Sequence, residues 1–126
     1  MHEAARREAA AFFDAYMAAF RRGDAAALAD MATHPMARIG AGTPELVAHA
    51  PDPAALRART GWHDTVEVAF DVLDATADKA HLHLKRAVRV RADGSPIEVI
   101  SGVYVLARGP EGRWRIAAVS VIARPA

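Results

Sequence analysis

Apolar residues recur at every third or fourth position over residues 3–22, which predicts a long amphipathic helix. Its apolar stripe consists of aromatic and methionine side chains at Phe12, Phe13, Tyr16, Met17 and Phe20. Gly23 suits the left-handed residue that ends a helix, and Asp24 suits the N-cap of the next one. A second, shorter helix is therefore expected over about 25–32.

The middle of the chain lacks a clear period. His34 and Pro35 are expected to end the second helix, and glycine and proline residues interrupt the segment 36–50. We expect this segment to be irregular or to form short strands. A third helix is predicted over about 53–60, because it is framed by an N-cap aspartate, a first-turn proline and a terminal glycine at Asp52, Pro53 and Gly61.

From Thr65 onward apolar residues alternate with polar ones, which is typical of β-strands. Four long segments show this pattern, and the connections TADK, ADGS and GPEG between them have the composition of hairpin turns. Four consecutive strands with short turns predict an antiparallel meander. Helices that precede such a meander predict an α+β domain, in which the helices cover one side of a curved sheet.

One charged residue interrupts an apolar strand face. The segment AHLHLKRAVRV places Leu82, Leu84, Val88 and Val90 on one face, with Arg86 in the same series. A bulge near Lys85–Ala87 would reverse this alternation. A buried guanidinium needs a carboxylate partner, such as Asp71 or Glu98, or an anionic ligand, so Arg86 is a candidate ligand-binding residue.

The last two strands are apolar on both faces. In the final one, Trp114, Ile116, Ala118 and Ile122 alternate with Ala117, Val119 and Val121. A strand in a two-layer domain needs only one buried face. We therefore expect a homodimer through the sheet face, with cover by helix or tail residues of the same chain as the alternative.

Composition narrows the class of protein. The chain of 126 residues is 52% apolar and has 16 basic against 15 acidic residues, so we expect a single globular domain over residues 1–126. Its weak net charge gives no reason to expect nucleic acid or a membrane surface as partner. The absence of cysteine excludes disulfides and thiolate metal sites. The N-terminal segment has no signal-peptide pattern, and a cytoplasmic protein is the expectation.

Two stretches carry a family resemblance. YMAAFRRGDAAALADM near the start, and the ending with Gly112, Trp114, Arg115 and Ile116, resemble the NTF2-like, SnoaL-like superfamily. That superfamily includes the ketosteroid isomerases, limonene epoxide hydrolase and scytalone dehydratase. The resemblance implies a cone, with the sheet wrapped around the helices and a pocket at its open end. The fold hosts enzymes, binding proteins and dimerisation modules, so the resemblance does not settle the function.

Tyr16 falls where ketosteroid isomerases, which this run resembles, carry a tyrosine that donates to a developing oxyanion. Their mechanism also needs a carboxylate base and a second acidic donor. The corresponding positions here fall near Gly40 and near Ser101 and Gly102, where the sequence has no carboxylate. Steroid isomerase chemistry is therefore disfavoured, and Tyr16 is either a core residue or a hydrogen-bond donor to a ligand.

Other side chains extend the list of candidates. His34 is a candidate general base, since its usual pKa suits proton transfer near neutral pH. Arg38 lies in the segment that lines the pocket in proteins with this fold. His81 and His83 share a strand face, but that face continues with Lys85, Arg89 and Arg91 and reads as solvated, so we predict no metal site.

Three large aromatic residues complete the candidate ligand contacts. Tyr104 and Trp114 occupy strand positions that can face inward, where core packing is the ordinary explanation. Trp62 follows the third helix and is expected to act as a plug or flap near the mouth of the cone.

Three functions remain open on this evidence. The first is a cofactor-free domain that binds a small apolar or cyclic molecule, with polar contacts from Tyr16, Arg38 and Arg86. The second is a SnoaL-like isomerase, cyclase or dehydratase, with His34 as base and Tyr16 as donor. The third is a structural dimerisation or partner-binding module.

Overall fold

Three helices precede or interrupt the sheet in the computed structural model, which describes residues 2–48 and 51–126. They are α1 (Glu3–Arg21), α2 (Ala25–Asp30) and α3 (Pro53–Thr60). The predicted caps of α2 and α3 are confirmed. The Asp24 side chain accepts a hydrogen bond from the Ala27 N–H at 3.0 Å, and the Asp52 side chain accepts from the first-turn amides of α3. None of the described helices is long and apolar enough to cross a membrane.

Six strands form one sheet in the order β2-β1-β6-β5-β4-β3. The predicted meander is confirmed as β3 (Asp64–Ala75), β4 (Lys79–Val90), β5 (Pro96–Arg108) and β6 (Trp114–Pro125). The segment 36–50, expected to be irregular or to form short strands, holds the second half of β1 (Ala32–Ile39) and all of β2 (Pro44–Val47), so the short-strand alternative is confirmed. The second helix ends at Asp30, so His34 and Pro35 lie within β1 rather than at a helix end. The second half of β1 runs parallel to β6, while the other pairings are antiparallel.

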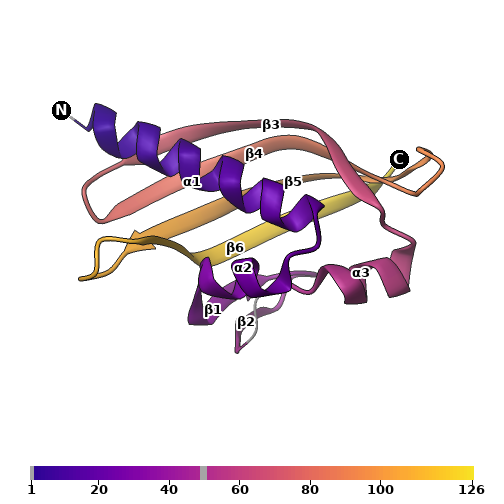
Figure 1. The fold of residues 1–126 in the computed structure, drawn as a ribbon, viewed down its shortest axis with the longest axis horizontal. Helices are drawn as coiled ribbons and strands as arrows, with labels where there is room; N and C mark the ends of the chain where they lie inside the picture. The colour runs from indigo at the N-terminus through magenta and orange to yellow at the C-terminus, as the bar shows by residue number, and fades with distance from the viewer. Residues whose placement is uncertain (1, 49–50) are drawn as a thin grey trace.

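The helices lie on one side of the curved sheet. Figure 1 shows α1 running along the long strands β3, β4 and β5, with α2 and α3 near β1. We call the sheet face that is turned toward α1 the inner face, and its opposite the outer face. Phe13 of α1 is fully buried, and its ring contacts the rings of Phe70 on β3 and Tyr104 on β5, both at 4.8 Å between centroids. The α+β cone expected from the sequence is therefore confirmed.

A bulge in β4 changes which residues face inward. The pairing of β4 with β5 shifts register between Leu84 and Ala87. Leu82, Leu84 and Ala87 belong to the core on the inner face, and Val88 points to the opposite face. The alternative of a bulge near Lys85–Ala87 is therefore confirmed. The plain alternation that put Val88 and Val90 on the face of Leu84 is wrong, because one extra residue in a strand reverses the alternation beyond it.

Candidate ligand site on the inner face

A row of polar side chains crosses the inner face where the sheet is bulged. Thr65, Arg89 and Glu98 are neighbours across β3, β4 and β5. The Arg89 Nη1 donates to Glu98 Oε2 at 2.6 Å, and the two side chains are only 19% and 20% exposed. Removal of either partner of such a desolvated ion pair should destabilise the fold, because the remaining charge would be partly buried without a counterion.

Two phenols lie close to this ion pair. Tyr16 of α1 and Tyr104 of β5 are both buried, with ring centroids 6.1 Å apart. Burial raises the pKa of Tyr104 to about 12, against an opposing effect of the Arg89 charge. Burial, followed by the proximity of Tyr104, raises the pKa of Tyr16 well above its usual value, again opposed by Arg89. Both hydroxyls therefore remain protonated donors at neutral pH.

The donors of this group are not all used by the protein. Arg89 Nε is buried and has no hydrogen-bond partner in the described part of the chain. The Tyr16 and Tyr104 side chains are buried beside it, and burial is the main cause of the raised pKa of each phenol. We call Tyr16, Arg89, Glu98 and Tyr104 the inner polar cluster. It combines one ion pair, whose guanidinium keeps a buried Nε–H donor without a partner, with two phenol hydroxyls.

The inner face beside the cluster is apolar and incompletely covered. On β6, Val119 pairs with Tyr104 and Val121 pairs with Gly102, which places both valines on the inner face. Both are only partly buried although they pack against the core, and the same holds for Phe20 and Phe70. Gly102 leaves this part of the face without a side chain. A Cβ atom at this position would lie 2.8 Å from the Ser120 carbonyl oxygen. The cluster thus borders an apolar surface that part of the sheet leaves open.

Two open hollows on the described part of the chain lie away from the cluster, because no residue of the cluster lines either of them. One, of about 120 Å³, lies at the β3–β4 turn around Ala75 and Ala80. The other, of about 470 Å³, lies between the end of α1, α3 and the start of β3. In this conformation the space around Tyr16 is filled by its aromatic neighbours Phe13, Phe20 and Tyr104.

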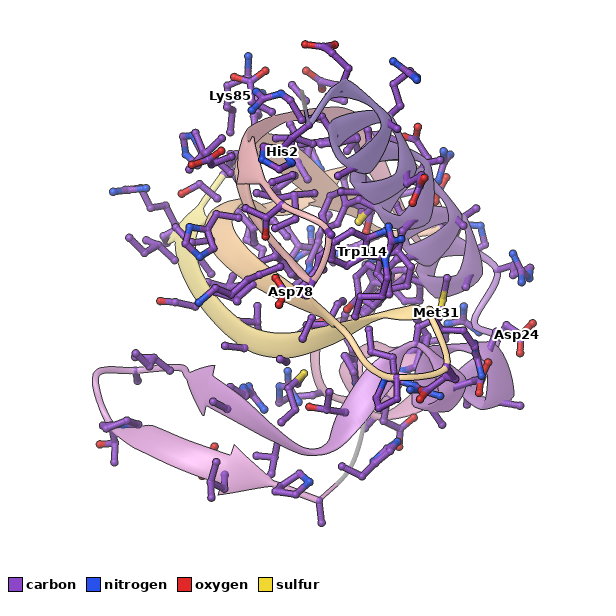
Figure 2. The ribbon with its side chains drawn as sticks, turned by 90° about the vertical axis from the view of Figure 1, so that its left-hand side faces the viewer. His2, Asp24, Met31, Asp78, Lys85 and Trp114 are labelled. Atoms are coloured by element: carbon purple, nitrogen blue, oxygen red, sulfur yellow. The ribbon has the colours of Figure 1, made fainter. Side chains whose placement is uncertain are left out.

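The tryptophans lie at opposite ends of the interior. Trp62 is fully buried, and its Nε1–H donates to the buried Thr65 hydroxyl at 2.9 Å. Of the two expected roles, a plug or a flap, this burial agrees with the plug, since a flap would be exposed. Trp114 lies between α1 and the curved strands, toward the end marked by Asp78 (Figure 2). The Arg108 guanidinium lies 4.2 Å above the Trp114 ring centroid.

Both ring nitrogens of His34 contact main-chain carbonyl oxygens. Its Nε2 lies 2.7 Å from the Ala29 carbonyl oxygen, and its Nδ1 lies 3.2 Å from the Ala48 carbonyl oxygen. These bonds raise the pKa of His34 above its usual value. Both nitrogens lie within hydrogen-bond distance of carbonyl oxygens, so the protonated ring can donate both bonds, whereas a neutral ring can donate only one.

The two arginines predicted as ligand contacts are both exposed. Arg38 pairs in register with Val119 on β6, and its guanidinium makes no hydrogen bond or ion pair with the described residues. Arg86 lies 3.7 Å from Glu67 in an exposed ion pair. The β4 bulge thus removes Arg86 from the inner face, where plain alternation had placed it, and puts Arg89 there instead.

The sequence predicted only two of the four residues of the cluster as candidate site residues. Tyr16 and Tyr104 were candidates, whereas Arg89 was assigned to a solvated face and Glu98 had no assigned facing. A usable signal was present in the β4–β5 hairpin. Arg89 and Glu98 have opposite charges and lie at similar distances from the ADGS turn, as expected of residues that pair across a hairpin.

Comparison with known proteins gives one match at the level of sequence families. Residues 7–123 match the family described as NTF2-like protein (DUF6841). None of the curated proteins matches the chain.

Solved structures share the fold at low sequence identity. A protein of the DUF3225 family from Pectobacterium atrosepticum is 20% identical, with a TM-score of 0.64 over 97% of this chain and 92% of that chain. A ketosteroid isomerase-like protein from Erwinia carotovora atroseptica is 17% identical, with a TM-score of 0.62 over 99% and 98%. A protein from Catenulispora acidiphila, solved in complex with S-DNPA, is 19% identical, with a TM-score of 0.62 over 93% and 91%.

Similarity at these identities shows the fold and carries no activity with it. The match to the sequence family, in contrast, spans nearly the whole chain. Together with helices packed on a six-stranded, curved and mostly antiparallel sheet, it shows that the chain belongs to the NTF2-like family.

Proposed function

We propose that this protein binds a small, largely apolar molecule on the inner face, through an acceptor oxygen of the ligand. The observation that carries the proposal is the buried Arg89 Nε–H, which has no acceptor among the described residues, beside the protonated hydroxyls of Tyr16 and Tyr104. A carbonyl, phenolate or carboxylate oxygen would satisfy these donors. Buried donors that lack an acceptor destabilise a protein by about 1–3 kcal/mol each, which favours a ligand that supplies one.

The apolar part of the ligand is proposed to lie against the partly buried inner residues Phe20, Phe70, Val119 and Val121. A site of this composition has apolar walls with a few convergent polar groups, as small-molecule sites do. The Catenulispora acidiphila relative in complex with S-DNPA supports the view that the fold can hold a small molecule. Since Tyr16 is enclosed by aromatic rings, binding requires these side chains to move apart.

The proposal is tested with 1-naphthoate as probe and 1-naphthylmethylamine as its cationic counterpart. Naphthoate is expected to raise the melting temperature, and the amine is not, because only the carboxylate accepts hydrogen bonds from the cluster. Tyr16→Phe and Tyr104→Phe keep the packing and remove one donor each, and each should weaken naphthoate binding about tenfold. Trp114→Phe removes an unpartnered donor outside the cluster and should leave binding unchanged. Equal binding by the wild type and a Tyr16→Phe/Tyr104→Phe double variant would overturn the proposal.

A second candidate function rests on the outer face, where we propose that two copies of the chain associate. Val103 on β5 and Ile122 on β6 are 45% and 54% exposed and face outward on adjacent strands. Ile39 on β1 continues this apolar surface beside β6. Burial of such a surface against its copy would remove it from water.

Analytical ultracentrifugation tests this association. The wild type is expected to sediment as a dimer, and Ile122→Arg as a monomer. Leu73→Arg, at an exposed apolar position on the distant strand β3, serves as the control and should remain dimeric. A wild type that is monomeric at high micromolar concentration would contradict the proposal.

The enzyme alternative with His34 as general base receives no support from the contacts of that ring. Both nitrogens point at main-chain carbonyl oxygens, whereas a base must hold a free lone pair within reach of the substrate proton. We therefore propose binding rather than catalysis for this domain.

A further inference from the structure

The larger hollow lies apart from the inner polar cluster and has a different character. It is a shallow hollow of about 470 Å³, wide open to solvent, and is lined by residues from the end of α1, from α3 and from the start of β3, namely Ala18, Arg21, Arg22, Arg57, His63 and Asp64. Three guanidinium groups and an imidazole thus share the lining with one carboxylate, Asp64, and a second carboxylate, Asp24, contacts Arg22 from beside the hollow. In a chain with nearly balanced charge, this is a local concentration of positive charge.

The arginine Arg57 is held in place by the core beneath it. Its Nε donates to the Trp62 carbonyl oxygen at 3.2 Å, and its guanidinium carbon lies 5.5 Å from the Trp62 ring centroid. Trp62 is itself fixed, because it is fully buried and bonded to Thr65. The two terminal nitrogens of Arg57 make no hydrogen bond with the described residues, so an oriented pair of donors faces the hollow.

The neighbouring arginines repeat this arrangement. Arg21 uses Nε and Nη2 to contact the two carboxylate oxygens of Asp64 at 2.9 and 3.1 Å. Arg22 uses the same two nitrogens to contact Asp24 at 3.2 and 3.1 Å. In each case Nη1 has no partner within the described chain. All three guanidiniums are therefore anchored through Nε and retain free terminal N–H donors.

We propose that this hollow is a binding site for a phosphate monoester. Guanidinium groups present planar, paired N–H donors that match the oxygens of a phosphate, and their fixed orientation lowers the entropy lost on binding. The volume admits a phosphate with a small organic group attached. Asp64 and Asp24 each offset one of the three positive charges, so the affinity is set mainly by the Arg57 charge together with the free N–H donors of Arg21 and Arg22, and binding weakens as the salt concentration rises.

The test is a titration of the isotope-labelled protein followed by NMR, with phenyl phosphate as probe and ionic strength held constant by sodium chloride. We expect saturable shifts of the backbone amides at Gly61–Asp64 and in the last turn of α1. Arg57→Gln should weaken binding about fivefold, the loss expected for a partly exposed charged contact. The matched control is Arg59→Gln on the same helix, since Arg59 does not line the hollow.

Two results would overturn the proposal. One is the absence of saturable shifts at constant ionic strength, and the other is equal weakening in Arg57→Gln and Arg59→Gln, which would indicate general screening. Arg22→Gln, at an exposed side chain with no role in the core, gives a second measurement if Arg57→Gln fails to fold. It should weaken binding to a similar degree, and unchanged binding in this variant would also contradict the proposal.

Discussion

Arg89 and Glu98 are joined at 2.6 Å across β4 and β5 while about four-fifths of each side chain is withdrawn from water. The pair lies on the inner face next to Tyr16 and Tyr104, where no other described carboxylate forms an ion pair with Arg89. Its energetic role differs from that of the ion pairs on the surface, because each charge here has lost most of its hydration.

Breaking this pair should therefore be costly. Glu98→Gln leaves the Arg89 charge without its counterion, and we expect the free energy of unfolding to fall by about 2–3 kcal/mol, somewhat below the range for fully buried pairs. The double variant Arg89→Met/Glu98→Leu should recover most of this loss, because no charge remains to be desolvated. Urea denaturation measures both effects.

The exposed pair of Lys85 and Asp71, at 3.3 Å, provides the comparison. Asp71→Asn should lower the free energy of unfolding by less than about 1 kcal/mol, as is usual for a solvated ion pair. Equal losses in Asp71→Asn and Glu98→Gln would show that burial does not govern the Arg89–Glu98 interaction.

His34 should make stability depend on pH. Its hydrogen bonds to the carbonyl oxygens of Ala29 and Ala48 raise its pKa in the folded chain. A group whose pKa is higher in the folded state stabilises the fold fully below its unfolded pKa of about 6.5, and this contribution is lost as the pH rises through the folded value. The melting-temperature difference between wild type and His34→Gln should therefore be larger at about pH 5.5 than at about pH 8.5.

Thr33→Ala is the control for this measurement. The Thr33 hydroxyl donates to the Pro35 carbonyl oxygen at 2.8 Å and does not titrate in this range, so its loss should be the same at both pH values. A His34→Gln effect that is equally independent of pH would contradict the assignment of two donating nitrogens.

Gly102 is expected to tolerate no side chain. A Cβ atom there would lie 2.8 Å from the Ser120 carbonyl oxygen and 3.2 Å from Val121 Cγ2, and the pairing of β5 with β6 fixes both neighbours. Gly102→Ala should lower the free energy of unfolding by about 1–3 kcal/mol, the usual cost of overpacking. Ser101→Ala on the outer face should change it by less than about 0.5 kcal/mol, and thermal unfolding would distinguish the two. A Gly102→Ala variant as stable as the wild type would show that the strands can separate here.

Glu67 lies in the β3 irregularity with a φ of 54°, a left-handed conformation that residues other than glycine rarely adopt. Asparagine tolerates this conformation better than glutamate, so Glu67→Asn should raise the free energy of unfolding by about 0.5–1 kcal/mol. Valine is the least suited, so Glu67→Val should lower it. Arg86→Gln removes the same exposed ion pair without changing residue 67 and shows how much of either effect comes from charge. A valine variant more stable than the asparagine variant would contradict the backbone conformation.

Local signals predicted much of the fold because the energetics of those elements are local. Asp52 and Gly61 bound α3 in the structure as the cap pattern predicted, since each satisfies backbone groups within a few residues. The alternation in the four long strands likewise reflects one buried face, which is why the meander was evident before any contact was known.

The missed features depend on partners far away in the sequence. β1 is a strand because its backbone pairs with β6, and the sequence of residues 32–39 has no alternating pattern that would predict this pairing. The position of Arg89 depends on a bulge around Lys85 and Arg86, which reverses the facing of every later residue in β4 without a distinctive local composition. Plain alternation therefore placed Arg86, which lies at this bulge, on the wrong face, whereas helical periodicity correctly placed Tyr16 on the buried side of α1.

The parallel pairing of β1 with β6 also constrains the order in which the chain can fold. Ala32 pairs with Ile116, and the Ile116 N–H donates to the Met31 carbonyl oxygen at 2.8 Å. This closes a loop of roughly 80 residues, and contacts over such separations form late because the entropy of closure must be overcome first. During synthesis, β1 and β2 emerge from the ribosome early and can pair with each other, but the other edge of β1 has no partner until β6 has followed.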